Sequence, residues 1–255
     1  MKKLLEVKQL TKRFGGVTAV DNVDFHVNDG EIVAVIGPNG AGKTTLFNMI
    51  SCFIQPTEGE VFYKGQKLTG KKINELASLG ISRTFQNLQI FKSLTVLENV
   101  MMGTHVKLKT NVISAGFRLP VVRHDEELSY KLAMDTLKMV GLDHLAYETA
   151  SQLSYGLQKQ LEFARAIIYN PDLIMLDEPM AGLNDNETNK MAGFIKDLKS
   201  KGHSFLFVEH KMATVMELAD RIVVIDFGKK IAEGTPDEIQ SNEKVISAYL
   251  GQEAI

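Results

Sequence analysis

Residues 37 to 45 read Gly37-Pro38-Asn39-Gly40-Ala41-Gly42-Lys43-Thr44-Thr45. They match the phosphate-binding pattern G-x-x-x-x-G-K-[ST], and they lie between an apolar run, Glu31 to Ile36, and a helical run, Leu46 to Ile50. Glycines let backbone N–H groups turn inward around phosphates, and the N-terminus of the following helix attracts anions. The stretch therefore predicts a nucleotide-binding loop that opens a parallel α/β unit.

Two side chains of this loop have expected roles toward a nucleotide. Lys43 should reach the β and γ phosphates as a point charge, and the Thr44 hydroxyl should occupy one coordination position of Mg²⁺. A glycine-rich turn that only happens to contain Lys-Thr is the alternative, and the flanking strand and helix argue against it. We therefore expect ATP and Mg²⁺ as cofactors.

A second apolar run, Leu173 to Leu176, ends in the two carboxylates Asp177 and Glu178. Ligands of open α/β sheets bind at the carboxyl ends of the strands. Asp177 is expected to contact Mg²⁺ directly or through the second coordination sphere, and Glu178 to polarise the attacking water. Acidic residues at strand ends are often merely solvated, so the phosphate-binding loop upstream is what favours the catalytic interpretation.

The rest of the chain predicts one large domain with an insertion. Strand-like stretches at Leu4 to Leu10 and Thr18 to Val27 indicate a small antiparallel layer, and Ser204 to Val208 is a further buried strand of the parallel core. Between Leu94 and Tyr169 the pattern becomes helical. We predict a core over 1–93 and 170–240 that includes a hairpin over 222–233, a helical subdomain over about 94–169, and a C-terminal helix over about 236–255.

Composition narrows the class of protein. The chain has 255 residues, a formal net charge of -2 and one cysteine, Cys52. Its charge balance argues against nucleic acid as the main partner, and one cysteine cannot form an intrachain disulfide. The N-terminus lacks the apolar run of a signal peptide, and no segment has the roughly 18 consecutive apolar residues that would span a bilayer. We expect a reduced, cytoplasmic chain that reaches a membrane only through a partner.

A further motif, Leu153-Ser154-Tyr155-Gly156-Leu157-Gln158, precedes the helix that carries Ala164-Arg165-Ala166. Taken alone, it favours only a helix N-cap at Ser154. Together with the phosphate-binding loop and the Asp177-Glu178 strand, however, this motif makes the chain resemble an ABC ATPase subunit. The resemblance extends from about Lys3 to about Ile239. The resemblance implies the ABC ATPase fold, in which this signature motif caps the γ-phosphate bound by the other protomer. Ser154, Tyr155 and Gly156 are thus implied nucleotide contacts, and a homodimer or a heterodimer with a second ABC ATPase subunit is implied.

The same resemblance assigns roles to further residues. Gln86 would join the Mg²⁺ and water network, His210 would contact the γ-phosphate, and Phe14 would stack on adenine, where tyrosine is usual. Residues 181–184, Ala181-Gly182-Leu183-Asn184, resemble the loop that links the two ATP sites. Leu157 and Lys211 depart from the usual pattern, which has a polar residue and an aspartate at these places.

Five features narrow the resemblance within the family: Phe14-Gly15-Gly16-Val17-Thr18-Ala19-Val20, Arg83-Thr84-Phe85-Gln86, the Leu153-Ser154-Tyr155-Gly156 form of the signature, Ala181-Gly182-Leu183-Asn184 and the longer stretch between Val100 and Leu128. They most resemble the ATPases of branched-chain amino acid importers. Such a subunit would bind transmembrane permease subunits on the inner face of the plasma membrane and would serve an external solute-binding protein indirectly. Importers of urea or other amides and lipid exporters share parts of the pattern. A soluble ABC ATPase of DNA repair or translation and a P-loop kinase for small molecules are the remaining alternatives, although the chain lacks the second cassette, the coiled coil or the basic arms of the former.

Overall fold

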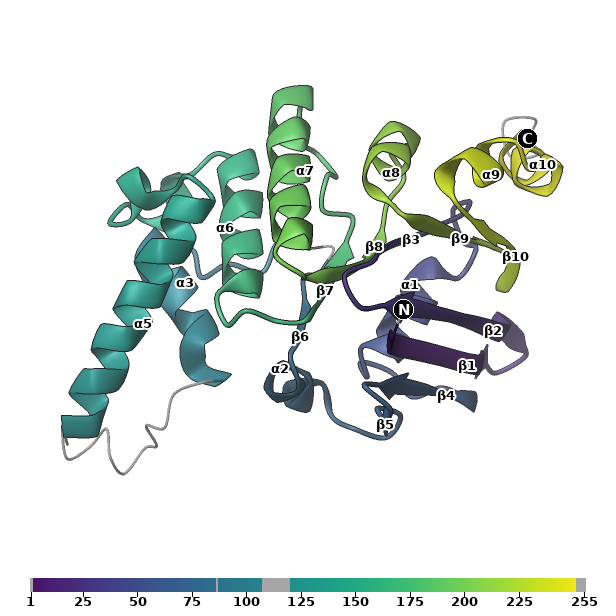
Figure 1. Cartoon of the computed structure of the whole chain (residues 1–255), viewed down its shortest axis with the longest axis horizontal. Coiled ribbons are helices and arrows are strands. Elements are labelled where there is room, and N and C mark those ends of the chain that lie inside the picture. The colour runs from purple at the N-terminus through teal and green to yellow at the C-terminus, as the bar shows by residue number, and fades with distance from the viewer. Residues whose placement is uncertain (1, 86, 107–119, 251–255) are drawn as a thin grey trace. The chain divides into compact units, whose positions relative to one another are not determined.

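Figure 1 shows a computed structural model of the chain, which describes residues 2–85, 87–106 and 120–250. The chain divides into two compact units. The first, which we call the core unit, comprises Met1–Arg83, Asp172–Ala181 and Ala192–Ile255. The second, the helical unit, comprises Thr84–Pro171 and Gly182–Met191. It therefore begins earlier than the expected subdomain of 94–169 and includes a segment that follows the Asp177-Glu178 strand.

A six-stranded sheet runs through the core unit in the order β10-β9-β3-β8-β7-β6. The strands are β3 (Ile32–Ile36), β6 (Ile81–Arg83), β7 (Leu173–Asp177), β8 (Ser204–Val208), β9 (Arg221–Asp226) and β10 (Lys229–Gly234). Neighbours from β9 to β6 are parallel, and β10 is antiparallel to β9 at one edge. Every residue of β3, β7 and β8 is buried, as is usual for parallel strands. The predicted parallel core and C-terminal hairpin are confirmed.

The second sheet is antiparallel and four-stranded, in the order β2-β1-β4-β5. It consists of β1 (Lys3–Phe14), β2 (Val17–Asn28), β4 (Glu58–Tyr63) and β5 (Gln66–Lys67). The predicted N-terminal antiparallel layer is therefore confirmed. The sequence analysis missed β4, β5 and β6, because β4 opens on polar residues and glycine while β5 and β6 are too short to show a period.

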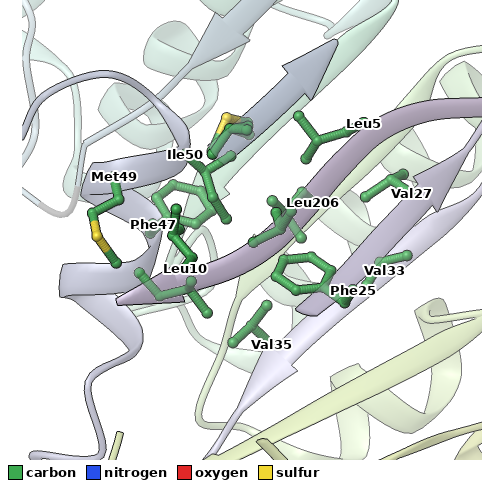
Figure 2. Packing of buried hydrophobic residues seen from close by; sticks show 14 of the residues in the cluster. Leu5, Leu10, Phe25, Val27, Val33, Val35, Phe47, Met49, Ile50 and Leu206 are labelled. Atoms are coloured by element: carbon green, nitrogen blue, oxygen red, sulfur yellow. The ribbon is translucent and has the colours of Figure 1, made fainter. Parts of the chain in front are cut away.

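The two sheets share one hydrophobic core with the helix that follows the phosphate-binding loop. Figure 2 shows Leu5 and Phe25 of the antiparallel sheet packed near Val33 and Leu206 of the parallel sheet, with Phe47 of the helix beside them. A side chain of this size stabilises the fold by about 2 kcal/mol when it is fully buried. The core therefore anchors the helix and, through it, the loop at the helix N-terminus.

Helices cover the sheets and form the second unit. The α-helices are α1 (Lys43–Ile50), α2 (Leu76–Leu79), α3 (Val96–Met101), α5 (Pro120–Met139), α6 (Tyr155–Ile167), α7 (Asp185–Ser200), α8 (Met212–Leu218), α9 (Pro236–Gln240) and α10 (Glu243–Leu250). In the helical unit, α3, α5 and α6 pack against one another, which confirms the predicted helical insertion. None of the helices that the structure describes is long and apolar enough to cross a membrane.

The C-terminal segment differs from the single helix expected over 236–255. Thr235 and Glu238 form a capping box at the start of α9, with Pro236 in the first turn, as the sequence indicated. However, the helix ends at Gln240, and the Asn242 side chain accepts a hydrogen bond from the Lys244 N–H at 3.0 Å as α10 begins. Asparagine favours such a local bond over continuation of a helix, so the segment forms two helices. Residues 251–255 of the expected helix lie outside the described residues.

Candidate active site

The phosphate-binding loop between β3 and α1 requires glycine at two positions for lack of space. A Cβ atom on Gly37 would lie 1.9 Å from the Ile225 carbonyl oxygen, and one on Gly42 would lie 2.3 Å from the Ala19 carbonyl oxygen. Both glycines also have positive φ, at 153° and 100°. The loop is thus pressed directly against the backbones of β9 and β2, which lets it follow a tight path.

The β9–β10 hairpin holds the same loop by hydrogen bonds. The Gly228 N–H in the hairpin turn donates to the Ala41 carbonyl at 2.9 Å, and the Gly228 carbonyl accepts from the Asp21 N–H at 2.8 Å. At the other end of the loop, Gly37 makes a backbone hydrogen bond to the Tyr249 hydroxyl of α10. The sequence analysis found the hairpin and the C-terminal helix but gave neither a role at the loop, because these residues are more than 180 positions away along the chain.

Lys43 supplies the positive side chain of the loop, and its ammonium group contacts the first two residues of the loop. Nζ donates to the carbonyls of Gly37 and Pro38, each at 2.7 Å. The side chain is buried, and burial lowers the pKa of Lys43, while the Glu178 carboxylate acts in the opposite direction. The first turn of α1 contains no acidic residue, and Asn39, Gly40 and Thr44 are exposed. The loop therefore offers an accessible positive helix terminus to an anion.

Asp177 ends β7 as predicted, and Arg83 lies beside it. The Arg83 Nη2 is 3.5 Å from the Asp177 Oδ2, and the two side chains are only 6% and 3% exposed. Arg83 also donates to the Asn48 side chain at 2.6 Å and to the Ser51 hydroxyl, so α1 helps to place it. Burial lowers the pKa of Arg83, and Asp177 opposes this. This contact was not predicted, because its only sequence signal is a basic residue at the carboxyl end of a short strand.

Glu178 and His210 meet at the ends of neighbouring strands. Glu178 Oε1 lies 2.9 Å from His210 Nε2. The Glu178 N–H still donates to the Val208 carbonyl at 3.0 Å, which continues the β7–β8 pairing by one residue. Glu178 then adopts a left-handed conformation with φ of 50°, which is uncommon for a residue other than glycine and ends the strand. The structure thus brings together the predicted water-polarising acid and His210, the predicted γ-phosphate contact, which we call the switch histidine.

The remaining predicted site residues lie in the helical unit, at the end of β1 or outside the described residues. Ser154 caps α6 in the helical unit, where its hydroxyl accepts from the Leu157 N–H at 3.5 Å. Gly156 is buried, and a Cβ atom there would lie 2.0 Å from a Glu187 carboxylate oxygen, whereas the neighbouring Tyr155 is exposed. Phe14 is 50% exposed at the end of β1. Gln86 lies outside the described residues.

The protein groups present fit a magnesium ion that arrives with a nucleotide. Among the residues that the structure describes, no three His, Cys, Asp or Glu side chains gather into a metal site. The donors at hand are the Asp177 carboxylate, which is buried at a strand end, and the exposed Thr44 hydroxyl at the start of α1. Mg²⁺ usually takes one or two protein carboxylates and completes its shell with phosphate and water oxygens. This sparse oxygen set matches that preference.

Comparison with known proteins gives matches along nearly the whole chain. Residues 20–181 match the family described as "ABC transporter", and residues 229–255 match the family "Branched-chain amino acid ATP-binding cassette transporter". The chain is 42% identical over 250 residues to the "High-affinity branched-chain amino acid transport ATP-binding protein BraF" of Pseudomonas aeruginosa, with 98% of each chain covered. It is likewise 42% identical over 250 residues to the corresponding protein LivG of Escherichia coli, again with 98% of each covered.

Solved structures of ATP-binding cassettes have a similar fold. MJ1267 in its ADP conformation, an ATP-binding cassette of an ABC transporter, matches with a TM-score of 0.85 and 34% identity over 98% of this chain and 100% of that one. The dimeric post-hydrolysis structure of the ATP-binding cassette MJ0796, bound to ADP and Pi, matches with a TM-score of 0.77 and 29% identity over 91% of this chain and 99% of that one.

Proposed function

The chain belongs to the ABC transporter family of ATP-binding subunits, and from this premise we propose that it hydrolyses ATP to power the import of branched-chain amino acids. The observation that carries hydrolysis is the Glu178–His210 pair, whose carboxylate also acts electrostatically on Lys43 of the phosphate-binding loop. The solute rests on the relatives, since BraF and LivG are named for branched-chain amino acid transport and the C-terminal match covers residues 229–255.

ATP binds with its phosphates in the loop of residues 37–45. The N–H groups at the start of α1 receive the β-phosphate, and Lys43 exchanges the carbonyls of Gly37 and Pro38 for phosphate oxygens. This exchange is favourable because an ammonium ion binds an anion more strongly than it binds a neutral carbonyl. Phe14, half-exposed at the end of β1, offers a ring for the adenine base. Thr44 and Asp177, with Gln86 as the resemblance implies, would hold Mg²⁺, which would neutralise charge on the phosphates.

Hydrolysis uses the two groups at the ends of β7 and β8. Water attacks the γ-phosphorus, the bond to the β–γ bridging oxygen breaks, and ADP and inorganic phosphate leave. Glu178 accepts a hydrogen bond from the attacking water and draws its proton away from the new bond. His210, 2.9 Å from Glu178 and with 43% of its side chain exposed, is placed to hydrogen-bond both that carboxylate and a γ-phosphate oxygen.

The active form is a dimer that buries two ATP molecules. Ser154, Tyr155 and Gly156 lie at the start of α6, where the positive end of the helix attracts an anion, and they serve the nucleotide of the partner subunit. The dimeric structure of MJ0796 supports this arrangement. Each subunit binds a permease on the inner face of the plasma membrane, and an external solute-binding protein delivers the amino acid.

The test replaces Glu178 by glutamine, which keeps size and hydrogen bonding but removes the proton acceptor. We expect ATP to stabilise a dimer in light scattering, and phosphate release to fall by at least about 100-fold, in line with loss of a general base. The control Glu217→Gln changes an exposed acid that pairs with Lys196, and it should hydrolyse normally. A Glu178→Gln protein that stays monomeric in ATP and releases phosphate at the wild-type rate would refute the proposal.

The solute is tested separately, in vesicles that contain the assembled transporter. Uptake of labelled leucine driven by ATP inside the vesicle is expected, while uptake of labelled urea is not. Uptake of urea in place of leucine would leave the ATPase intact and overturn the assignment to branched-chain amino acids. Phosphate transfer to a small molecule instead of water would identify a kinase.

A further inference from the structure

Glu209, between β8 and His210, carries a buried carboxylate. Within the described part of the chain, this carboxylate accepts hydrogen bonds from backbone N–H groups. Only 3% of the residue is exposed. Oε1 accepts from the Met180 N–H at 2.8 Å, and Oε2 accepts from the N–H groups of His210 at 2.8 Å and Lys211 at 3.2 Å. The two oxygens thus bind two different segments of chain.

These two segments carry the reacting groups of the proposed hydrolysis. Met180 lies two residues after Glu178, and the turn between them is closed by the Ala181 N–H, which donates to the Glu178 carbonyl at 3.2 Å. His210 directly follows Glu209. One carboxylate therefore joins the segment after β7 to the segment after β8. Glu178 and His210, which lie 2.9 Å apart, belong to these same two segments.

A carboxylate suits this place because all three groups that hydrogen-bond to it within the described part of the chain are donors. Hydrogen bonds to an ionised acceptor are about twice as strong as neutral ones, and they hold best where water is excluded. An amide in the same place would present one oxygen and one NH₂ group. The NH₂ group would then face a backbone N–H, and a buried donor would lose its acceptor.

We propose that Glu209 is a positioning residue that holds Glu178 and His210 in register, and that it ties the switch histidine to the segment that continues into residues 181–184. This inference rests on the proposed function, because it concerns the same hydrolytic site. Residues 181–184 resemble the loop that links the two ATP sites of a dimer. A movement of this loop that displaces Met180 therefore acts on His210 through a single side chain.

The test is Glu209→Gln in the purified full-length chain, with steady-state ATP hydrolysis measured over a range of ATP concentrations. Displacement of catalytic groups by even about 1 Å can reduce turnover up to about 100-fold, so we expect kcat to fall by at least about ten-fold. KM for ATP and the affinity for a fluorescent ATP analogue should stay within about two-fold, because the hydrogen bonds of Glu209 within the described part of the chain go to Met180, His210 and Lys211 and not to the phosphate-binding loop. Glu209→Asp keeps the charge and should retain more turnover than Glu209→Gln.

The control separates positioning from a general loss of stability. Glu31 is also a carboxylate that accepts a backbone N–H, from Asn28 at 2.7 Å, and it pairs with Arg221. Glu31→Gln is expected to lower the unfolding temperature while the folded protein keeps its kcat. Wild-type kcat in Glu209→Gln, or a loss of kcat matched by an equal loss of ATP affinity, would overturn the inference. A wild-type chain that releases no phosphate would instead overturn the proposed function itself.

Discussion

Replacement of Gly37 by alanine is the sharpest test of how the phosphate-binding loop is held. Gly37 is the first residue of the loop, and its φ of 153° lies in a region that residues with a side chain rarely adopt. The new Cβ atom would lie 1.9 Å from the Ile225 carbonyl oxygen, 3.0 Å from the Ile225 carbonyl carbon and 3.4 Å from the Ala41 Cβ. The obstacle is backbone of a central strand, which no rotamer change relieves.

Two costs add in this variant. The Ile225 oxygen would have to retreat by about 1.5 Å to reach an ordinary contact, and overpacking of this kind costs about 1–3 kcal/mol. The backbone conformation costs about 1–3 kcal/mol more. A total near 4 kcal/mol corresponds to a fall in unfolding temperature of roughly 8–16 °C for a chain of this size. Nucleotide affinity should fall as well, because β9 and the loop move apart.

Thermal unfolding followed by circular dichroism measures the first effect, and titration with a fluorescent ATP analogue measures the second. Gly40→Ala is the matched control in the same loop, since Gly40 also has positive φ, at 78°, but has nothing within 4 Å of its Cβ position. It should cost only the backbone strain, about 1 kcal/mol. Gly193→Ala, in the interior of α7 with open space around it, should stabilise the chain by about 1 kcal/mol.

The order of the unfolding temperatures of the three variants tests whether β9 packs against the loop. If Gly37→Ala unfolds at the same temperature as Gly40→Ala, the loop is not pressed against β9 and the packing argument fails. If Gly193→Ala is as destabilising as Gly37→Ala, the measured loss does not report on the loop.

Two further predictions concern residues that the sequence analysis did not place at the site. Burial raises the pKa of Tyr249 to about 12, so the unfolded chain loses this proton first, near pH 10; the stabilisation from neutral Tyr249 is complete below about pH 10 and is lost as the pH rises toward 12. An ultraviolet titration of phenolate absorbance should lose one late-titrating group in Tyr249→Phe, and an unchanged curve would contradict the partly buried position of Tyr249. Arg83→Met leaves the buried Asp177 carboxylate without its arginine and should destabilise the chain by about 3 kcal/mol in chemical denaturation, whereas Arg83→Lys should lose less; equal stability of Arg83→Met and wild type would show that the pair contributes nothing.

Sequence patterns were reliable wherever the chemistry lies in consecutive residues. The strand, loop and helix around Gly37 to Thr45 could be read directly, because glycine spacing and a change of hydrophobic period are local properties. The same holds for the Asp177-Glu178 strand end and for Ser154 as an N-cap. The short strands β4, β5 and β6 were not predicted. They are strands because of the partners with which they pair, and their own hydrophobic pattern is too weak to indicate a strand.

Nucleotide binding and family membership were thus determined by the sequence alone, since backbone N–H groups in a glycine loop and carboxylates at a strand end need only the right residue types in the right order. Only the tertiary structure decided what surrounds these groups. It placed Arg83 beside Asp177, Gly228 against Ala41, and the Glu209 carboxylate between the segments of Glu178 and His210. The physical reason is that parallel strands bring their carboxyl ends to one edge of the sheet, where residues far apart in sequence become neighbours.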